Sequence, residues 1–206
     1  MRVGIGVTTY KRPEMLEKCL ASIEKYTKGG YKLHVAIDTD RDRKGVAYRK
    51  NECLRALKDC HHVFLFDDDC YPIKEGWEDL FINSGQEHLL FLNNGLHNLY
   101  GKLNSMHIYE NCGGVFMYIN KAAIERVGAF NEDFKTWGFE HAEYSIRILG
   151  EHGIYPMLVG TEQYLYSEDY SNPLHKSSIT NEEKQLLFDK NFPIFRQPIK
   201  NIYLPL

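Results

Sequence analysis

Three consecutive carboxylates, Asp67, Asp68 and Asp69, directly follow the apolar run 63–66. Alternate side chains of an extended chain share a face, so we expect Asp67 and Asp69 to converge while Asp68 points away. Ligand sites of open α/β sheets lie at the carboxyl ends of strands, where two such carboxylates suit a hard divalent cation, which in turn suits a diphosphate. A solvated acidic turn is the alternative, and the buried strand before the triplet favours the binding site.

A second polar segment, Val-Thr-Thr-Tyr-Lys-Arg-Pro at 7–13, also stands at the end of a strand-like run. Its hydroxyls, aromatic ring and cations could hold a nucleotide base and phosphate, and the helix expected to start at Pro13 favours anions at its N-terminus. The segment lacks the glycine-rich patterns of dinucleotide and P-loop sites. Asp38 ends the next strand-like run and could accept from a base imide or a ribose hydroxyl, whereas residues 39–44 are most simply a solvated loop.

The apolar periodicity predicts the elements that position these groups. Strands are expected at 2–7, 31–37, 63–66 and 89–92, alternating with helices at 13–23, 46–57 and 75–82. This alternation indicates an α/β fold with flanking helices and a mostly parallel central sheet. Further along, we expect a strand at 114–119, helices at 121–127 and 140–149, and a return to the sheet at 155–159. The polar, proline-containing residues 165–206 predict a tail that wraps over the body, or else a loosely ordered terminus.

Composition sets the broad class. The chain has 206 residues, 43% hydrophobic and 26% charged, which is typical of one globular domain. With 25 basic and 28 acidic residues, it carries no strong electrostatic footprint for nucleic acid. The apolar runs are far shorter than the ~18 residues of a membrane span, and the opening residues do not resemble a signal peptide. Five cysteines without a CxxC pattern are expected as small buried residues, so we expect a cytoplasmic protein.

The order of these motifs resembles the glycosyltransferases of the A fold, in the large family 2 group. The resemblance in the first half rests on segment 7–13, Asp38, Ala47-Tyr48-Arg49-Lys50-Asn51 and the triplet. Segments 113–116, 127–130 and 137–143, with Arg147, resemble the acceptor side of galactosyltransferase-like enzymes. Roughly residues 3 to 175 are covered. The resemblance implies one domain with a nucleotide-binding half at 1–92, an acceptor side at 93–164 and a tail at 165–206.

The same resemblance implies the ligands of the first half. The nucleotide, typically uridine diphosphate, would be held by Thr8, Thr9, Tyr10, Arg12, Asp38, Lys44, Arg49, Asp67 and Asp68. Asp67 would approach the ribose or the metal, and Asp69 of the DXD motif would ligate the metal. Gly113 and Gly114 would let the backbone approach the donor sugar closely, as the absence of a side chain permits.

Glycosyl transfer needs a base for the acceptor proton, worth about 100- to 10,000-fold, and the resemblance places it at the start of the helix 140–149. The related family has Glu-Asp there, with the aspartate as base, whereas this chain has Glu140 and His141. Both remain candidates: Glu140 is slightly favoured for acceptor binding or as base, and the near-neutral pKa of an unperturbed histidine suits His141.

Three further residues each have two alternative roles. Trp137 stacks on a sugar or closes the core, two readings that the sequence leaves equal. Glu143 is an acceptor-side candidate, although an i, i+4 pair with Arg147 favours a structural role. His175 is the remaining metal candidate, with a surface histidine as the alternative. Together with an aspartate it would favour Mn2+ over Mg2+ and bring the tail over the donor.

The sequence therefore predicts a metal-dependent glycosyltransferase. It would move a sugar from a nucleotide-sugar, with a UDP-sugar expected, to the hydroxyl of a glycan, a lipid-linked or another acceptor, with inversion. Because His141 departs from the family pattern, an inactive nucleotide- or glycan-binding module is the alternative. A sugar nucleotidyltransferase is less favoured, since it would need a glycine-rich loop where Thr8, Thr9 and Tyr10 stand. A homo-oligomer could complete the acceptor side of so short a chain.

Overall fold

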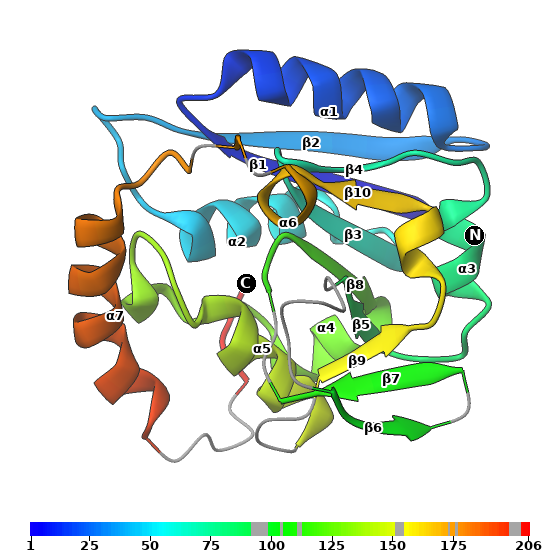
Figure 1. The fold of residues 1–206 in the computed structure, drawn as a ribbon. Coiled ribbons are helices and arrows are strands. Elements are labelled where there is room, and N and C mark those ends of the chain that lie inside the picture. The colour runs from blue at the N-terminus through cyan, green and yellow to red at the C-terminus, as the bar shows by residue number, and fades with distance from the viewer. Residues whose placement is uncertain are drawn as a thin grey trace.

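A five-stranded sheet runs through the middle of the molecule (Figure 1). In the computed structural model, which describes residues 1–91, 99–103, 105–110, 113–150, 155–172, 174–175, 177–197 and 203–206, its strand order is β2-β1-β3-β8-β5. The strands are β1 (Val3–Tyr10), β2 (Tyr31–Asp38), β3 (His62–Asp67), β5 (His88–Leu90) and β8 (Phe116–Asn120). β1 pairs in parallel with β2 and β3, and only β8 runs against its neighbours β3 and β5. The predicted mostly parallel sheet is confirmed.

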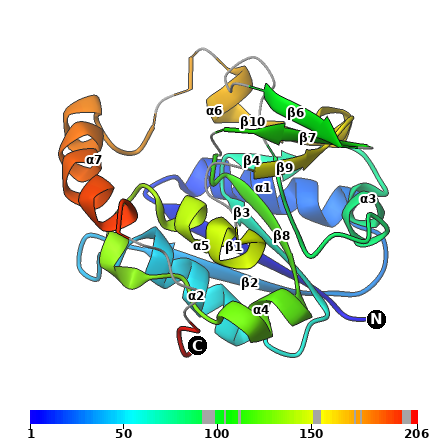
Figure 2. The same cartoon turned by 90° about the horizontal axis from the view of Figure 1, so that it is seen from below.

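Helices cover both faces of this sheet, which makes three layers (Figure 2). On one face lie α1 (Pro13–Tyr26) and α3 (Trp77–Ile82); on the other lie α2 (Val46–Ala56), α4 (Lys121–Val127) and α5 (Glu140–Leu149). The alternation of side chains along β3 explains the two cores. Phe64 and Phe66 pack with residues of α1 and α3, whereas Val63 and Leu65 pack with residues of α2, α4 and α5.

Two small sheets flank the central one. β4 (Cys70–Pro72) pairs with β10 (Leu165–Ser167), and β7 (Met106–Tyr109) lies between β6 (Leu99–Leu103) and β9 (Tyr155–Leu158). The expected return of 155–159 to the central sheet is wrong, because β9 pairs antiparallel with β7 instead. A short apolar run shows that a segment is buried but does not select its hydrogen-bonding partner. Two short 3-10 helices, η1 (Glu132–Phe134) and η2 (Thr161–Gln163), complete this half.

The tail contains helical structure that the sequence analysis did not predict. α6 (Glu168–Ser171) follows β10, and α7 (Asn181–Phe195) is a helix of 15 residues. Thr180 and Glu183 cap α7 reciprocally, since each side chain accepts from the other residue's backbone N–H. This T-x-x-E pattern is the sequence signal that indicates the start of α7. Pro193 is tolerated inside the helix near its end. Beyond α7, Leu204 bridges back to Gly128, so the tail does cross the body.

Most predicted elements differ from the observed ones only at their ends. The helices 121–127 and 140–149 have the predicted bounds, whereas β1 extends to Tyr10 because its partner β2 continues to Asp38. Leu92, the expected end of the fourth strand, lies outside the described residues, as does Cys112. The other cysteines are buried, as predicted: Cys19, Cys53, Cys60 and Cys70. Within the described ranges, no helix combines the length and apolarity needed to cross a bilayer.

Candidate active site

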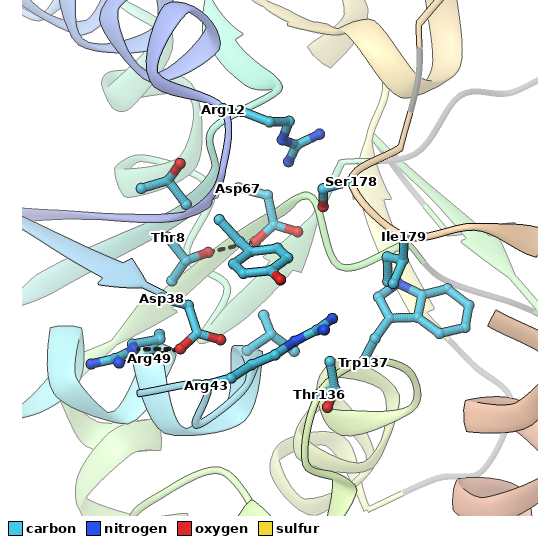
Figure 3. A pocket seen from close by; sticks show the side chains of 13 residues that line it. Thr8, Arg12, Asp38, Arg43, Arg49, Asp67, Thr136, Trp137, Ser178 and Ile179 are labelled. Atoms are coloured by element: carbon cyan, nitrogen blue, oxygen red, sulfur yellow. Dashed lines mark hydrogen bonds and ion pairs between the residues drawn. The ribbon is translucent and has the colours of Figure 1, made fainter. Parts of the chain in front are cut away.

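The ends of β1, β2 and β3 meet at one edge of the sheet. The parallel register places Tyr10 beside Asp38 and Thr8 beside Asp67. The Thr8 hydroxyl donates to Asp67 Oδ1 over 2.8 Å, which joins two of the predicted side chains directly (Figure 3). The polar groups that the sequence placed after three separate strands therefore converge in space.

A first pocket opens between these strand ends and two later segments (Figure 3). Tyr10 and Asp38, the last residues of β1 and β2, line it together with Arg43 of the following loop, and Trp137 and Ile179 line it from the two later segments. The guanidinium carbon of Arg43 is 4.6 Å from the centre of the Tyr10 ring. The sequence analysis predicted a tail over the donor but did not identify Ser178 and Ile179, and it missed Arg43 because it interpreted residues 39–44 as a solvated loop.

Asp38 organises the loop between β2 and α2. Its carboxylate accepts from the backbone N–H groups of Lys44 and Gly45 at 3.0 and 3.1 Å, and from the Arg49 side chain. Gly45 has φ +92°, and a Cβ there would lie 2.0 Å from the carbonyl oxygen of Lys135, so only glycine fits. The Lys44 side chain pairs with the exposed Asp42 at 3.2 Å. Asp38 and Arg49 thus line the first pocket, while the Lys44 ammonium is tied to the loop.

In the acidic triplet, Asp68 and Asp69 are buried and Asp67 is half-buried. Asp68 is fully buried, accepts from the Thr9 hydroxyl at 2.5 Å and forms an ion pair with Arg12. The strand ends at Asp67, and the turn that follows directs Asp68 toward Thr9 and Arg12, so that Asp68 does not line the first pocket. Burial raises the pKa of Asp68 to about 7, against the lowering effect of Arg12 and Thr9. The interpretation as a solvated acidic turn is excluded.

Asp69 and His175, two of the predicted metal ligands, lie side by side in the structure. His175 Nε2 lies 3.3 Å from Asp69 Oδ2, and the histidine side chain is 5% exposed. Arg12 Nη1 reaches the same Asp69 oxygen at 2.7 Å. Asp69 Oδ1 is buried and has no hydrogen-bond partner within the described residues. In the same part of the chain, no cluster of three or more histidine, cysteine or carboxylate side chains is arranged to hold a metal ion.

Lys50, inside α2, is a fully buried lysine between Asp67 and Glu140. Its Nζ donates to the Gly114 carbonyl at 2.9 Å and lies 3.7 Å from Asp67 Oδ1 and 3.6 Å from Glu140 Oε1. Burial alone would lower the pKa of Lys50, but the carboxylates of Asp67 and Glu140 outweigh it and raise this pKa. The charged ammonium therefore links the acidic triplet to the start of α5. A lysine in a helical pattern normally indicates a surface position, which is why the sequence analysis gave it no role.

Glu140 and His141 form a pair at the start of α5. His141 Nδ1 lies 3.0 Å from Glu140 Oε1, and Glu140 is almost completely buried. Burial alone would raise the pKa of Glu140, but His141 and Lys50 lower it to about 2. A Cβ on Gly114 would come within 2.6 Å of His141 Nδ1, so this glycine makes room for the imidazole.

A second pocket adjoins the first and contains this pair. It is lined by Asp69, Gly113, Gly114, Glu140 and His141, among others. The residues that line both pockets are Arg12, Val46, Asp67, Trp137, Ser178 and Ile179. Glu143, in contrast, faces Arg147 Nε at 2.7 Å, and Arg147 donates to the carbonyls of Val127 and Ala129. These bonds match the structural alternative for Glu143.

The loop before Glu140 is held by the tail. Lys135 and Phe139 both have positive φ, at 52° and 72°, which is costly for residues other than glycine. The buried amide of Asn191 in α7 contacts three loop carbonyls: those of Phe134, Trp137 and Gly138, at 2.8, 2.7 and 3.2 Å. The Phe139 ring packs against Phe188, Phe192 and Phe195. α7 therefore fixes the backbone that presents Trp137 and Glu140.

The central sheet and the helices that cover it have the A fold of glycosyltransferases, as comparison with solved structures shows. TarS of S. aureus superposes with a TM-score of 0.61 at 13% identity, over 98% of this chain and 41% of its own. GalNAc-T7 with UDP, GalNAc and Mn2+ gives 0.59 at 10%, over 77% and 42%. A mutant of Drosophila β1,4-galactosyltransferase 7 with manganese, UDP-Gal and xylobiose gives 0.53 at 18%, over 89% and 78%.

The protein spans less than half the length of TarS and GalNAc-T7. No protein-family model matches the sequence, and no curated protein matches it either. The predicted A fold is confirmed. The residues of the two pockets, and not the comparisons, indicate the activity of this protein.

Proposed function

We propose that the protein is a glycosyltransferase that moves a sugar from a nucleoside-diphosphate sugar to an acceptor hydroxyl. One observation carries this proposal: the two pockets share Arg12, Asp67 and Trp137 as a common wall. One pocket has the aromatic ring and hydrogen-bonding groups that a nucleoside requires, and the other has carboxylates and an imidazole. A diphosphate crossing the common wall would place its sugar next to Glu140 and His141. The division into a nucleotide-binding half, 1–92, an acceptor side, 93–164, and a tail, 165–206, belongs to this proposal.

UDP is the proposed nucleotide. Tyr10 offers a ring face for the base, and Asp38 lines the same pocket with Thr8 and Thr9. The GalNAc-T7 and galactosyltransferase 7 structures contain UDP and UDP-Gal respectively, which supports a UDP-sugar for this chain. The acceptor hydroxyl belongs to a glycan, a lipid-linked or another molecule, and the xylobiose of galactosyltransferase 7 supports the glycan. A cytoplasmic location and a homo-oligomer stay predictions.

The residues present fit a divalent cation that is shared with a diphosphate. Asp69 Oδ1 is a buried oxygen without a hydrogen-bond partner in the described chain, and His175 lies beside the same carboxylate. Two side chains are fewer than a closed protein site provides, but they match cations that take their other ligands from phosphates and water. Asp69 and His175 would therefore hold the ion, with Mn2+ favoured over Mg2+ by the imidazole. When bound, it would neutralise charge developing on the leaving diphosphate.

His141 is the proposed base, with Glu140 as its positioning residue. The pKa of Glu140, lowered to about 2, makes this carboxylate a poor proton acceptor at neutral pH. Its contact with His141 Nδ1 would instead orient the imidazole and stabilise the imidazolium. The acceptor oxygen would attack the anomeric carbon as the bond to the diphosphate breaks, and His141 would take the hydroxyl proton. A single displacement of this kind inverts the anomeric centre.

The test is release of UDP from a panel of UDP-hexoses and UDP-N-acetylhexosamines in the presence of Mn2+, with and without sugar acceptors. We expect UDP release by the natural protein and at least a 100-fold loss in Asp69→Asn. Asp59→Asn, which makes the same charge change at an exposed position, is the matched control and should retain full activity. If UDP binds but is never released from any sugar, the protein is a binding module, as the departure at His141 would allow. If no nucleotide binds at all, the proposal is wrong.

A further inference from the structure

Arg12, the residue before α1, lies between the carboxylates of Asp68 and Asp69. Its Nη1 lies 2.7 Å from Asp69 Oδ2, and its Nη2 pairs with Asp68 Oδ1. Nη1 is also 3.3 Å from His175 Nε2. The guanidinium therefore contacts the two groups that would ligate a divalent cation.

A divalent cation on Asp69 Oδ2 and His175 Nε2 would stand in contact with this guanidinium. Both groups are positively charged, and Asp69, His175 and Asp68 are buried, so water screens the repulsion poorly. The carboxylates, in turn, are already neutralised by an arginine that remains protonated under all ordinary conditions. Arg12 and a divalent cation therefore compete for the same place.

The guanidinium also lies where a diphosphate would arrive. Arg12 lines both pockets and belongs to their common wall. In Figure 3 its side chain extends from the end of β1 toward the space above Asp67. Its Nε is buried and has no hydrogen-bond partner among the described residues. An arginine with an unused donor and a planar fork is well suited to phosphate oxygens.

We propose that Arg12 is the built-in counter-ion of the carboxylate site, and that it excludes the divalent cation until a nucleoside diphosphate draws it away. This inference rests on the proposed function. Its consequence is an order of binding: the nucleotide enters first or together with the cation, because the diphosphate both attracts the guanidinium and adds ligands for the ion. Arg12 thus makes cation binding depend on the donor.

The test measures Mn2+ binding to the nucleotide-free protein, from the electron paramagnetic resonance signal of free Mn2+. We expect weak binding by the natural protein and at least tenfold tighter binding by Arg12→Gln. Arg126→Gln, which removes the same charge from a surface pair with Glu87, is the matched control and should behave as the natural protein. A saturating amount of UDP should tighten Mn2+ binding at least tenfold in the natural protein and much less in Arg12→Gln. Equal Mn2+ affinities of Arg12→Gln and the natural protein would overturn the inference.

A second variant covers the case in which Arg12→Gln fails to fold, which circular dichroism would reveal. Arg12→Lys keeps the charge but cannot bridge Asp68 and Asp69 with one fork, so we expect intermediate Mn2+ affinity and a weakened effect of UDP. The natural protein alone also decides the matter, since equal Mn2+ affinity with and without UDP contradicts the inference. If UDP tightens Mn2+ binding equally in the natural protein and in the Arg12 variants, the proposed function stands and only the role of Arg12 falls. If UDP does not bind, both fall.

Discussion

The two sides of the site are held together by different means. The side formed by β1, β2 and β3 is fixed by backbone hydrogen bonds of a parallel ladder, whose register sets Tyr10 beside Asp38. The opposite side, with Trp137 and Glu140, lies on a loop in which two residues other than glycine have positive φ, and this loop is fixed by side chains of α7. The strand ends are held in place by the sheet itself, whereas the loop depends on its contacts with α7. The difference suggests that catalysis is more sensitive to changes in α7 than nucleotide binding is.

The largest expected effect is a loss of catalysis without a loss of nucleotide binding. His141→Asn removes the proposed base and should lower kcat by about 100- to 10,000-fold, the usual range for general base catalysis. UDP affinity, measured by calorimetry, should change less than threefold, because the strand ends remain intact. A variant that loses both would show that the two sides are not independent.

The second prediction concerns the tie between the sheet and α5. His88 of β5 is buried, with Nδ1 2.7 Å from the Tyr118 carbonyl oxygen and Nε2 2.8 Å from the Ser145 hydroxyl. Burial lowers the pKa of His88 to about 4. The unfolded chain binds a proton near pH 6.5, so stability is full above that pH and decreases as the pH falls toward 4. The loss is about 3 kcal/mol.

Denaturant unfolding at pH 7 and pH 4.5 measures this loss. His88→Asn should be less stable at pH 7 but should show a smaller decrease on acidification than the natural protein, since the titrating group is gone. An equal decrease in both proteins would contradict the assignment of this pH dependence to His88.

The third prediction tests the tail directly. Asn191→Ala leaves three loop carbonyls without the amide donor and should cost about 1–3 kcal/mol of unfolding free energy. Because the loop presents Glu140, kcat should fall about tenfold while KM for the donor changes little. Gln185→Ala, on the exposed part of the same helix, is the control. A fall in stability with unchanged kcat would mean that the amide only supports the fold.

The smallest expected effect is at the start of α7. Thr180→Ala removes the side chain that accepts from Glu183 N–H and should cost about 1 kcal/mol. Thr180→Ser keeps the cap and should be nearly neutral. If α7 positions the loop, kcat should decrease slightly in the alanine variant only, measured below the temperature at which either variant begins to unfold.

Sequence reasoning predicted the strand side better than the tail side, for physical reasons. Tyr10, Asp38 and Asp67 each follow a strand with a clear apolar pattern, and parallel strands necessarily bring such ends to one edge. Lys50 and Asn191 are polar residues within helices, where the sequence pattern indicates solvent exposure. They contact partners that are distant in the sequence, such as Glu140, 90 positions from Lys50, and Trp137, 54 positions from Asn191.

The central claim is that the acidic triplet and the ends of β1, β2 and β3 form a donor site that works with a divalent cation. The most direct measurement is a calorimetric titration of UDP into the protein, with and without Mn2+, repeated on Asp69→Asn. We predict that tight binding needs both Mn2+ and Asp69, and that either omission weakens it at least tenfold. UDP binding that is indifferent to Mn2+ and to Asp69, or the absence of any UDP binding, would contradict the account.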